Sequence, residues 1–113
     1  MAAQGPLYNL RDIQDLLRDD KCIFTSNAQA GYQELGFETK EQAIECILWL
    51  DPSEYRTTLE YEDGKFWDDY VAKIHCPATK TMRRVYIKLR IPSPSSVQHV
   101  VVTSFHAEKV IAP

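Results

Sequence analysis

Four side chains in the second half of the chain are of types that carry out chemistry on a phosphodiester. They are Tyr55, Arg56, Asp68 and His106. Histidine transfers protons near neutral pH, and arginine neutralises the charge that builds up on a phosphate in a transition state. Ordinary roles are also open for two of them, because Asp68 could cap a turn or pair with a surface cation and His106 could be a solvated strand end.

The segment Arg83–Ile91 alternates polar and apolar residues with the period of a β-strand. One face of this strand would carry its aliphatic side chains, and the other would carry Arg84, Tyr86, Lys88 and Arg90. Exposed cations neutralise phosphates, and an aromatic ring can stack on an unpaired base. A polar outer face is equally typical of any half-buried strand, so this pattern alone also fits a face that is only solvated.

Charge is distributed unevenly along the chain, whose formal net charge is −3. Residues 1–54 carry four basic and ten acidic side chains, a balance of −6, whereas residues 55–113 carry nine basic and six acidic side chains, a balance of +3. A chain polarised in this way can present a cationic surface to an anionic partner although its average is acidic. The alternative is that both halves are simply solvated.

A length of 113 residues and a hydrophobic content of 44% favour one domain over residues 1–113. No apolar run approaches the ~20 residues of a membrane span, and the N-terminus lacks the basic and apolar regions of a secretion signal. Cys22, Cys46 and Cys76 are scattered and odd in number, which favours reduced thiols over a disulfide framework or a metal site. We therefore expect a cytoplasmic protein without a bound metal or a membrane partner.

Capping signals in the first half of the chain predict three helices. Asn9 would cap a first helix, in which apolar residues recur at helical spacing. Ser26–Gln29 and Thr39–Gln42 have the form of capping boxes and would open the second and third helices. Asp51-Pro52 would end the third helix and could start one further turn.

The second half of the chain predicts strands. The candidates are Arg56–Glu62, Phe66–Ile74, Arg83–Ile91 and Val97–His106, and Cys22–Phe24 could add an edge strand. Short connections, among them the turn signal Asp63-Gly64, indicate an antiparallel meander. Helices followed by strands indicate an α+β fold, with the N-terminal helices packed on one face of an antiparallel sheet of about four strands. In a simple meander, the strand ends would bring Tyr55, Arg56, Asp68 and His106 to one edge of the outer face.

Several short motifs in this region occur together, and their order and spacing are more specific than any one of them. They are Tyr55-Arg56, Tyr61, Trp67-Asp68-Asp69, Arg84-Val85-Tyr86-Ile87-Lys88 and Val102-Thr103-Ser104-Phe105-His106. With them, the chain resembles the MqsR family of toxins from type II toxin–antitoxin modules, which are mRNA interferases with a RelE-like fold. The similarity runs roughly from Leu7 to Lys109.

The resemblance implies an endoribonuclease that cleaves single-stranded mRNA independently of the ribosome. The internal nucleophile would be the 2′-hydroxyl, and no metal or other cofactor would be needed. A cognate antitoxin would neutralise the toxin, which would not bind DNA by itself. In this family the antitoxin carries a zinc-binding domain and a helix-turn-helix domain.

The resemblance also assigns roles to residues. The tyrosine of the family's catalytic region falls on Tyr86, and the aromatic–basic pair Tyr-Lys falls on Tyr55 and Arg56. A functional glutamine falls on Asp68 and a C-terminal lysine on His106. The expected catalytic set is thus Tyr86, His106, Asp68 and Arg56, and the expected RNA-binding residues are Tyr55, Arg84 and Lys88.

Asp68 and His106 are departures from the family pattern, and the acidic pI of about 5.5 is a third. As a pair, Asp68 and His106 could be the acid and base of a conventional ribonuclease, although neither can be assigned to one role. They could equally mark a changed cleavage sequence or weakened activity. The alternative function is therefore a catalytically decayed RelE-like module that binds RNA or a partner protein.

Overall fold

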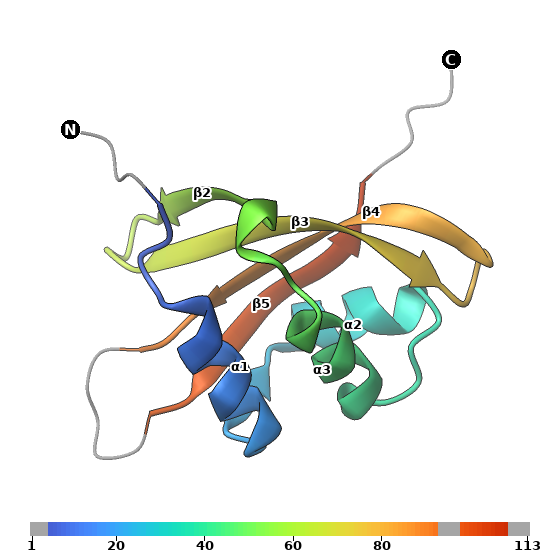
Figure 1. Cartoon of the computed structure of the whole chain (residues 1–113), viewed down its shortest axis with the longest axis horizontal. Coiled ribbons are helices and arrows are strands. Elements are labelled where there is room, and N and C mark those ends of the chain that lie inside the picture. The colour runs from blue at the N-terminus through green and yellow to red at the C-terminus, as the bar shows by residue number, and fades with distance from the viewer. Residues whose placement is uncertain (1–4, 93–97, 109–113) are drawn as a thin grey trace.

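A computed structural model describes residues 5–92 and 98–108 of the chain. The helices are α1 (Leu10–Arg18), α2 (Ser26–Glu34) and α3 (Lys40–Leu48), followed by the 3-10 turn η1 (Pro52–Glu54). The strands are β1 (Cys22–Phe24), β2 (Tyr55–Glu60), β3 (Phe66–Cys76), β4 (Thr81–Arg90) and β5 (Val100–Ala107) (Figure 1). These elements confirm the α+β class. Val97, the expected start of the last strand, lies outside the described residues.

The five strands form one sheet in the order β1-β5-β4-β3-β2. Strands β2 to β5 are successive antiparallel neighbours, which confirms the meander. The sheet has five strands rather than about four because Cys22–Phe24 pairs in parallel with Val100–Val102 at the edge. This strand lies between α1 and α2 in the sequence, far from β5, so only the folded chain brings the two strands together.

Local capping explains where the helices begin. Asn9 accepts a hydrogen bond from the backbone N–H of Asp12, and Thr39 forms a complete capping box with Gln42, as predicted. The second cap is Thr25 rather than Ser26, because the Thr25 hydroxyl accepts from the N–H of Ala28 and Ser26 is already helical. The expected extra turn at Asp51-Pro52 is η1.

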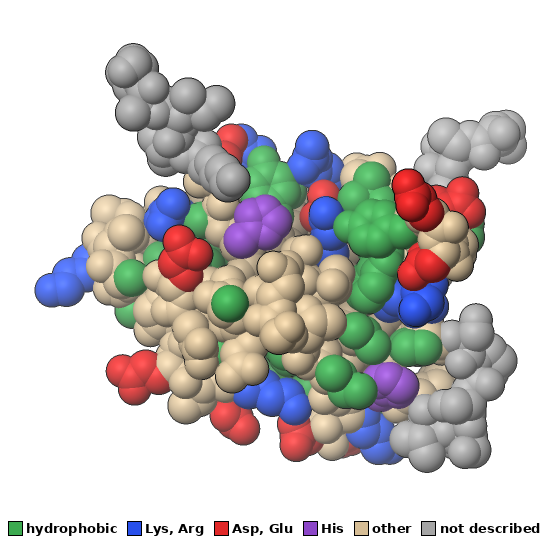
Figure 2. All heavy atoms as spheres, turned by 180° about the vertical axis from the view of Figure 1, so that it is seen from behind, with side chains coloured by type: hydrophobic (Ala, Val, Ile, Leu, Met, Phe, Trp, Pro, Cys, Tyr) green, Lys and Arg blue, Asp and Glu red, His purple; other side chains and the backbone are tan. Residues whose placement is uncertain are grey.

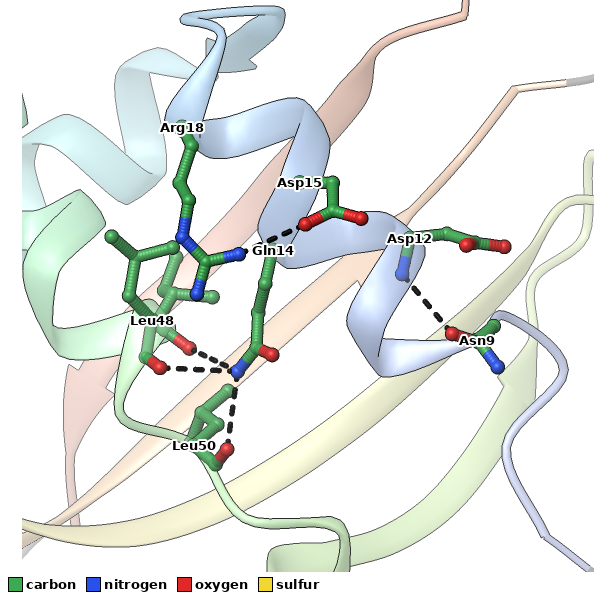
Figure 3. Close-up of polar contacts among 8 residues, drawn as sticks. Asn9, Asp12, Gln14, Asp15, Arg18, Leu48 and Leu50 are labelled. Carbon is green, nitrogen blue, oxygen red and sulfur yellow. Dashed lines mark hydrogen bonds and ion pairs between the residues drawn. The ribbon is translucent and has the colours of Figure 1, made fainter.

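The helices form one layer on one side of the sheet (Figure 1). Figure 3 shows Gln14 of α1 reaching the end of α3, where its Nε2 atom donates to the backbone oxygens of Leu48 and Leu50 at 3.2 and 3.1 Å. Helix α2 lies so close to β5 that a Cβ atom on Gly31 would stand 2.0 Å from the Phe105 oxygen. Only glycine fits that contact. The apolar core therefore lies between the helices and one sheet face, and the other face, called here the outer face, is left for function.

Candidate active site

Strand β4 sorts its side chains between the two faces as its alternation predicts. The aliphatic residues Val85, Ile87 and Leu89 are fully buried against the helices. Between them, the polar side chains of β4 point to the outer face and are partly or fully exposed: Arg84, Tyr86, Lys88 and Arg90. The predicted row of cations interleaved with one tyrosine is therefore present on the surface.

Tyr86 lies at the centre of a stack of three side chains from three strands. His106 of β5 is directly opposite Tyr86 in the register, and their rings are stacked with centroids 5.6 Å apart and planes 11° apart. The guanidinium carbon of Arg56, from β2, lies 5.2 Å from the Tyr86 ring centroid. Arg56 is the extra residue at a shift in the β2–β3 register, and such bulges re-aim side chains. Three of the four predicted catalytic residues therefore come together.

The stack borders a surface pocket of about 440 Å³. Its charged and hydrogen-bonding side chains come from four strands and include Arg56, Asp69, Tyr86, Lys88 and His106. Three basic groups and a phenol around one hollow can bind a phosphate and also supply proton donors to it. The pocket thus combines anion binding with acid–base groups.

Asp69 contributes the buried acidic group of this pocket, and no pattern in the sequence predicted a role for it. Its side chain is only 3% exposed, and its Oδ2 atom lies 3.5 Å from the Arg56 Nη1 atom. Within the described part of the chain, its Oδ1 atom is buried without a hydrogen-bond partner. Burial raises the pKa of the Asp69 carboxyl, while the positive charges of Lys88, Arg56 and His106 act to lower it.

Asp68 lies on the opposite face of the sheet, so its expected convergence with the others is wrong. Its Oδ1 atom accepts hydrogen bonds from the Leu7 N–H at 3.0 Å and the Thr58 hydroxyl at 2.6 Å, and its Oδ2 atom accepts from the Tyr8 N–H at 2.8 Å. Successive residues of a strand point to opposite faces, and Asp68 takes the inner one. Its carboxylate holds the segment before α1 against the sheet.

Tyr55 does not join the stack either, although it precedes Arg56. Its ring packs edge-on against Tyr70, with centroids 5.8 Å apart, and its hydroxyl lies 2.7 Å from the Thr58 hydroxyl. It belongs to the partly buried residues around the core. The aromatic–basic pair is therefore split, with the tyrosine supporting the sheet and the arginine reaching the pocket.

A model of the family described as "Motility quorum-sensing regulator, toxin of MqsA" matches residues 5–107. The chain belongs to this family. It is thus a toxin of a toxin–antitoxin system, and an antitoxin is its partner. No curated protein matches the chain.

A second hollow, of about 510 Å³, adjoins the toxin's pocket and shares Arg56 with it. Lys73 and Arg84 also line this second hollow. Lys73 and Arg84 are directly opposite each other in the β3–β4 register, and like charges in that position repel. Glu108 offsets part of this repulsion at 3.7 Å from Arg84. An anion bound between the two cations would relieve their repulsion. Lys73 belongs to no motif, so the sequence did not predict its place here.

At the other end of β4, cations of the toxin lie against aromatic rings. Lys88 donates to the Tyr61 hydroxyl at 3.1 Å, and the Arg90 guanidinium lies 5.3 Å from the Trp67 ring centroid. Tyr61 packs on Trp67 with centroids 6.2 Å apart and remains 41% exposed. Together with Tyr86, these rings make the outer face alternate between charge and aromatic surface.

The described basic side chains do not form a broad patch on one side of the toxin. On the side of the molecule shown in Figure 2, basic and acidic side chains are interspersed instead of forming one large patch of a single sign. On this side, an anionic partner would therefore have to be recognised by individual cations rather than by a broad positive field.

Other reactive groups of the toxin lie outside the pocket. The three cysteines are free, and burial raises the pKa of Cys46 to about 11, which keeps its thiol protonated and weakly nucleophilic. Within residues 5–92 and 98–108, no group of three or more His, Cys, Asp or Glu side chains could hold a metal ion. In the same residues, no helix is long and apolar enough to cross a bilayer.

Proposed function

We propose that the toxin is an mRNA interferase, an endoribonuclease that cleaves single-stranded mRNA in the pocket beside Tyr86. The observation that carries this proposal is the stack of His106, Tyr86 and Arg56. A histidine and a phenol are proton-transfer groups, and a guanidinium binds phosphate. The three are in contact beside an open hollow on the face that the helices leave free, so all of them can touch one phosphodiester.

The chemistry uses a nucleophile that RNA itself supplies. The 2′-hydroxyl loses its proton, its oxygen bonds to the adjacent phosphorus, and the bond from phosphorus to the 5′-oxygen of the next nucleotide breaks. The products are a 2′,3′-cyclic phosphate and a 5′-hydroxyl, and the leaving oxygen takes up a proton. His106 can accept the first proton or donate the second, and Tyr86 can donate the second. Arg56 would neutralise the charge on the phosphate as the new bond forms.

Flanking phosphates would bind along β4. Alternate residues of a strand are about 7 Å apart, so Arg84 and Lys88 stand on either side of Tyr86. Lys73 would assist Arg84 at one end of the path. The exposed ring of Tyr61 would offer a stacking surface for a base at the other. A requirement for the 2′-hydroxyl excludes DNA as a substrate, and a messenger substrate places the activity in the cytoplasm.

Asp68 has no part in this proposal, since its carboxylate is bound to the segment before α1. The departure from the family's glutamine at this position therefore puts no negative charge beside the substrate. Tyr55 would act indirectly, by supporting the strand that presents Arg56. The departure at His106 does lie in the pocket, and it replaces a permanent cation with a group that titrates near neutral pH.

The test is cleavage of RNA by the purified full-length toxin, with the 5′ ends of the products mapped. We expect cuts at defined sites in single-stranded RNA, no effect of a metal chelator, and loss of cutting when the nucleotide before the cut is 2′-deoxy. Tyr86→Phe removes only the hydroxyl and should abolish the cuts. Undiminished cleavage of the 2′-deoxy substrate would overturn the proposal. Cleavage at the wild-type rate by both Tyr86→Phe and His106→Ala would also overturn it.

A further inference from the structure

The carboxylate of Asp69 is a buried charge that the proposed reaction does not use. It lies in one cross-strand row with Thr57 and Lys88, next to the row that holds Tyr86 and His106. Its Oδ2 atom faces Arg56 at 3.5 Å. Asp69 is thus placed between the three basic groups that surround the pocket.

Holding this carboxylate in place is costly to the fold. A buried carboxylate is tolerated when its oxygens accept hydrogen bonds, as those of Asp68 do. In contrast, the Oδ1 atom of Asp69 has no such partner among the described residues. Lys88, the cation opposite it in the register, donates instead to the Tyr61 hydroxyl. A buried carboxylate oxygen without a hydrogen bond lowers stability even when the other oxygen is paired, and such groups are concentrated at functional sites.

Among the described residues, the charged groups that act on the Asp69 carboxyl all line the pocket. They come from three other strands of the sheet: Arg56 from β2, Lys88 from β4 and His106 from β5. The other charged group on the rim is Glu108, which pairs with Arg84. The attraction between Asp69 and each of the three cations is mutual, so the carboxylate also favours the positively charged form of His106.

We propose that Asp69 is a positioning residue of the nuclease, which holds the Arg56 guanidinium over Tyr86 and stabilises the cationic form of His106. The proposal rests on the function proposed above. An arginine held at one place loses less freedom when it binds the phosphate in the transition state. A carboxylate beside a histidine stabilises the imidazolium that forms when the histidine accepts a proton, as in other acid–base sets.

The experiment compares Asp69→Asn with Asp68→Asn, its neighbour on the other face. Each variant removes one carboxylate and keeps the shape of the side chain. We expect Asp69→Asn to lower kcat about tenfold or more, while KM stays the same or falls because a negative charge near RNA has been removed. The pH–rate limb that reports His106 should move to lower pH. Asp68→Asn, assayed below its unfolding temperature, should keep the wild-type kcat and pH profile.

A second measurement does not depend on cleavage. The ring protons of the three histidines can be titrated by NMR in the full chain without RNA. In Asp69→Asn, the titration of His106 should move to lower pH, while His75 and His99 serve as internal references that do not move. If the wild-type toxin cleaves no RNA, the proposed function fails, and this titration still decides the effect of Asp69 on His106.

Two results would overturn the role of Asp69. One is a His106 titration that is identical in Asp69→Asn and the wild type. The other is an Asp69→Asn enzyme with unchanged kcat and pH profile. A double variant with Arg56→Gln tests the first half of the proposal: if Asp69 acts by holding Arg56, the losses in kcat are not multiplicative. Fully multiplicative losses would remove the link to Arg56.

Discussion

Asp68 and Asp69 are adjacent in the chain, and the sheet gives them opposite surroundings. Asp68 faces the helical side, where two backbone N–H groups and a hydroxyl saturate its carboxylate. Asp69 faces the outer side, where one oxygen lies near an arginine and the other has no partner among the described residues. On the inner face the carboxylate holds the chain together, whereas on the outer face it lies in the pocket where we propose that a substrate binds. Burial alone therefore does not distinguish the carboxylate that holds the chain from the one that we propose as a positioning residue, but their hydrogen bonds differ.

Among the substitutions that compare the two faces, His106→Ala should cause the largest loss of RNA cleavage. We expect His106→Ala to reduce RNA cleavage roughly a hundredfold or more, because a proton-transfer group is lost. The unfolding temperature should change little, since His106 is exposed on the outer face. Rates on a mapped oligonucleotide and a thermal melt measure the two effects. Unfolding of this variant at the assay temperature would contradict the assignment of His106 to the functional face.

Asp68→Asn should have the opposite profile. The amide cannot accept all three hydrogen bonds that the carboxylate accepts, and leaving buried donors unpaired costs about 1–3 kcal/mol. Denaturant unfolding measures this loss, and Thr58→Val, which removes one of the three donors, should reproduce part of it. A variant of normal stability that no longer cleaves RNA would place Asp68 in the reaction and erase the contrast with Asp69.

Asp69→Asn should stabilise the toxin at neutral pH. Burial raises the pKa of Asp69 in the folded state above the ordinary 3.8, so the folded protein binds this proton more tightly than the unfolded chain does. Wild-type stability from this group is therefore greatest below pH 3.8 and is lost as pH rises through the folded pKa. Asparagine does not ionise. Melting curves should show that Asp69→Asn raises the unfolding temperature, and that this increase grows from acid to neutral pH. An increase that is independent of pH would point to another cause.

The smallest effect should come from Lys73, at the edge of the outer face. Lys73→Gln removes a cation opposite Arg84, so we expect RNA binding to weaken about twofold to fivefold and its salt dependence to fall by about one unit of slope. Stability should stay the same or rise slightly because a like-charge pair is relieved. Lys80→Gln, an exposed cation in the turn between β3 and β4, is the matched control. Equal losses in both variants would indicate net charge rather than a site.

The strand alternation was sufficient to predict the face of β4 but not that of β3. In β4 the apolar and polar residues alternate, so Tyr86 could be assigned to the outer face without coordinates. In β3 the run Phe66–Tyr70 has aromatic residues on both sides of Asp68 and Asp69 and no period of two. Its phase depends on pairing with β2 and β4, in which Asp69 is opposite Lys88 and Asp68 opposite Leu89. A one-residue change of register would exchange the two carboxylates.

Three other features could not be derived from the sequence pattern alone: the exact cap of the second helix, the partner of the expected edge strand Cys22–Phe24, and the place of Lys73. Thr25 and Ser26 are equally good caps by residue type. The backbone conformation decides that Thr25 is the cap that accepts the hydrogen bond from the Ala28 N–H. Strand β1 is three residues long, too short to show a period, and its parallel partner is nearly 80 positions away in sequence. Lys73 carried no motif, and its position opposite Arg84 is a property of the sheet.

By itself, the sequence determined the α+β class, the first and third helix caps, the antiparallel meander, the outward row of β4 and the family, because these depend on periodicity, capping chemistry and the order of motifs. The tertiary structure alone decided which of two adjacent aspartates enters the pocket and that Arg56, Tyr86 and His106 meet while Tyr55 does not. The reason is physical: these contacts depend on the register and one bulge between strands, and register arises from packing between distant segments of the chain.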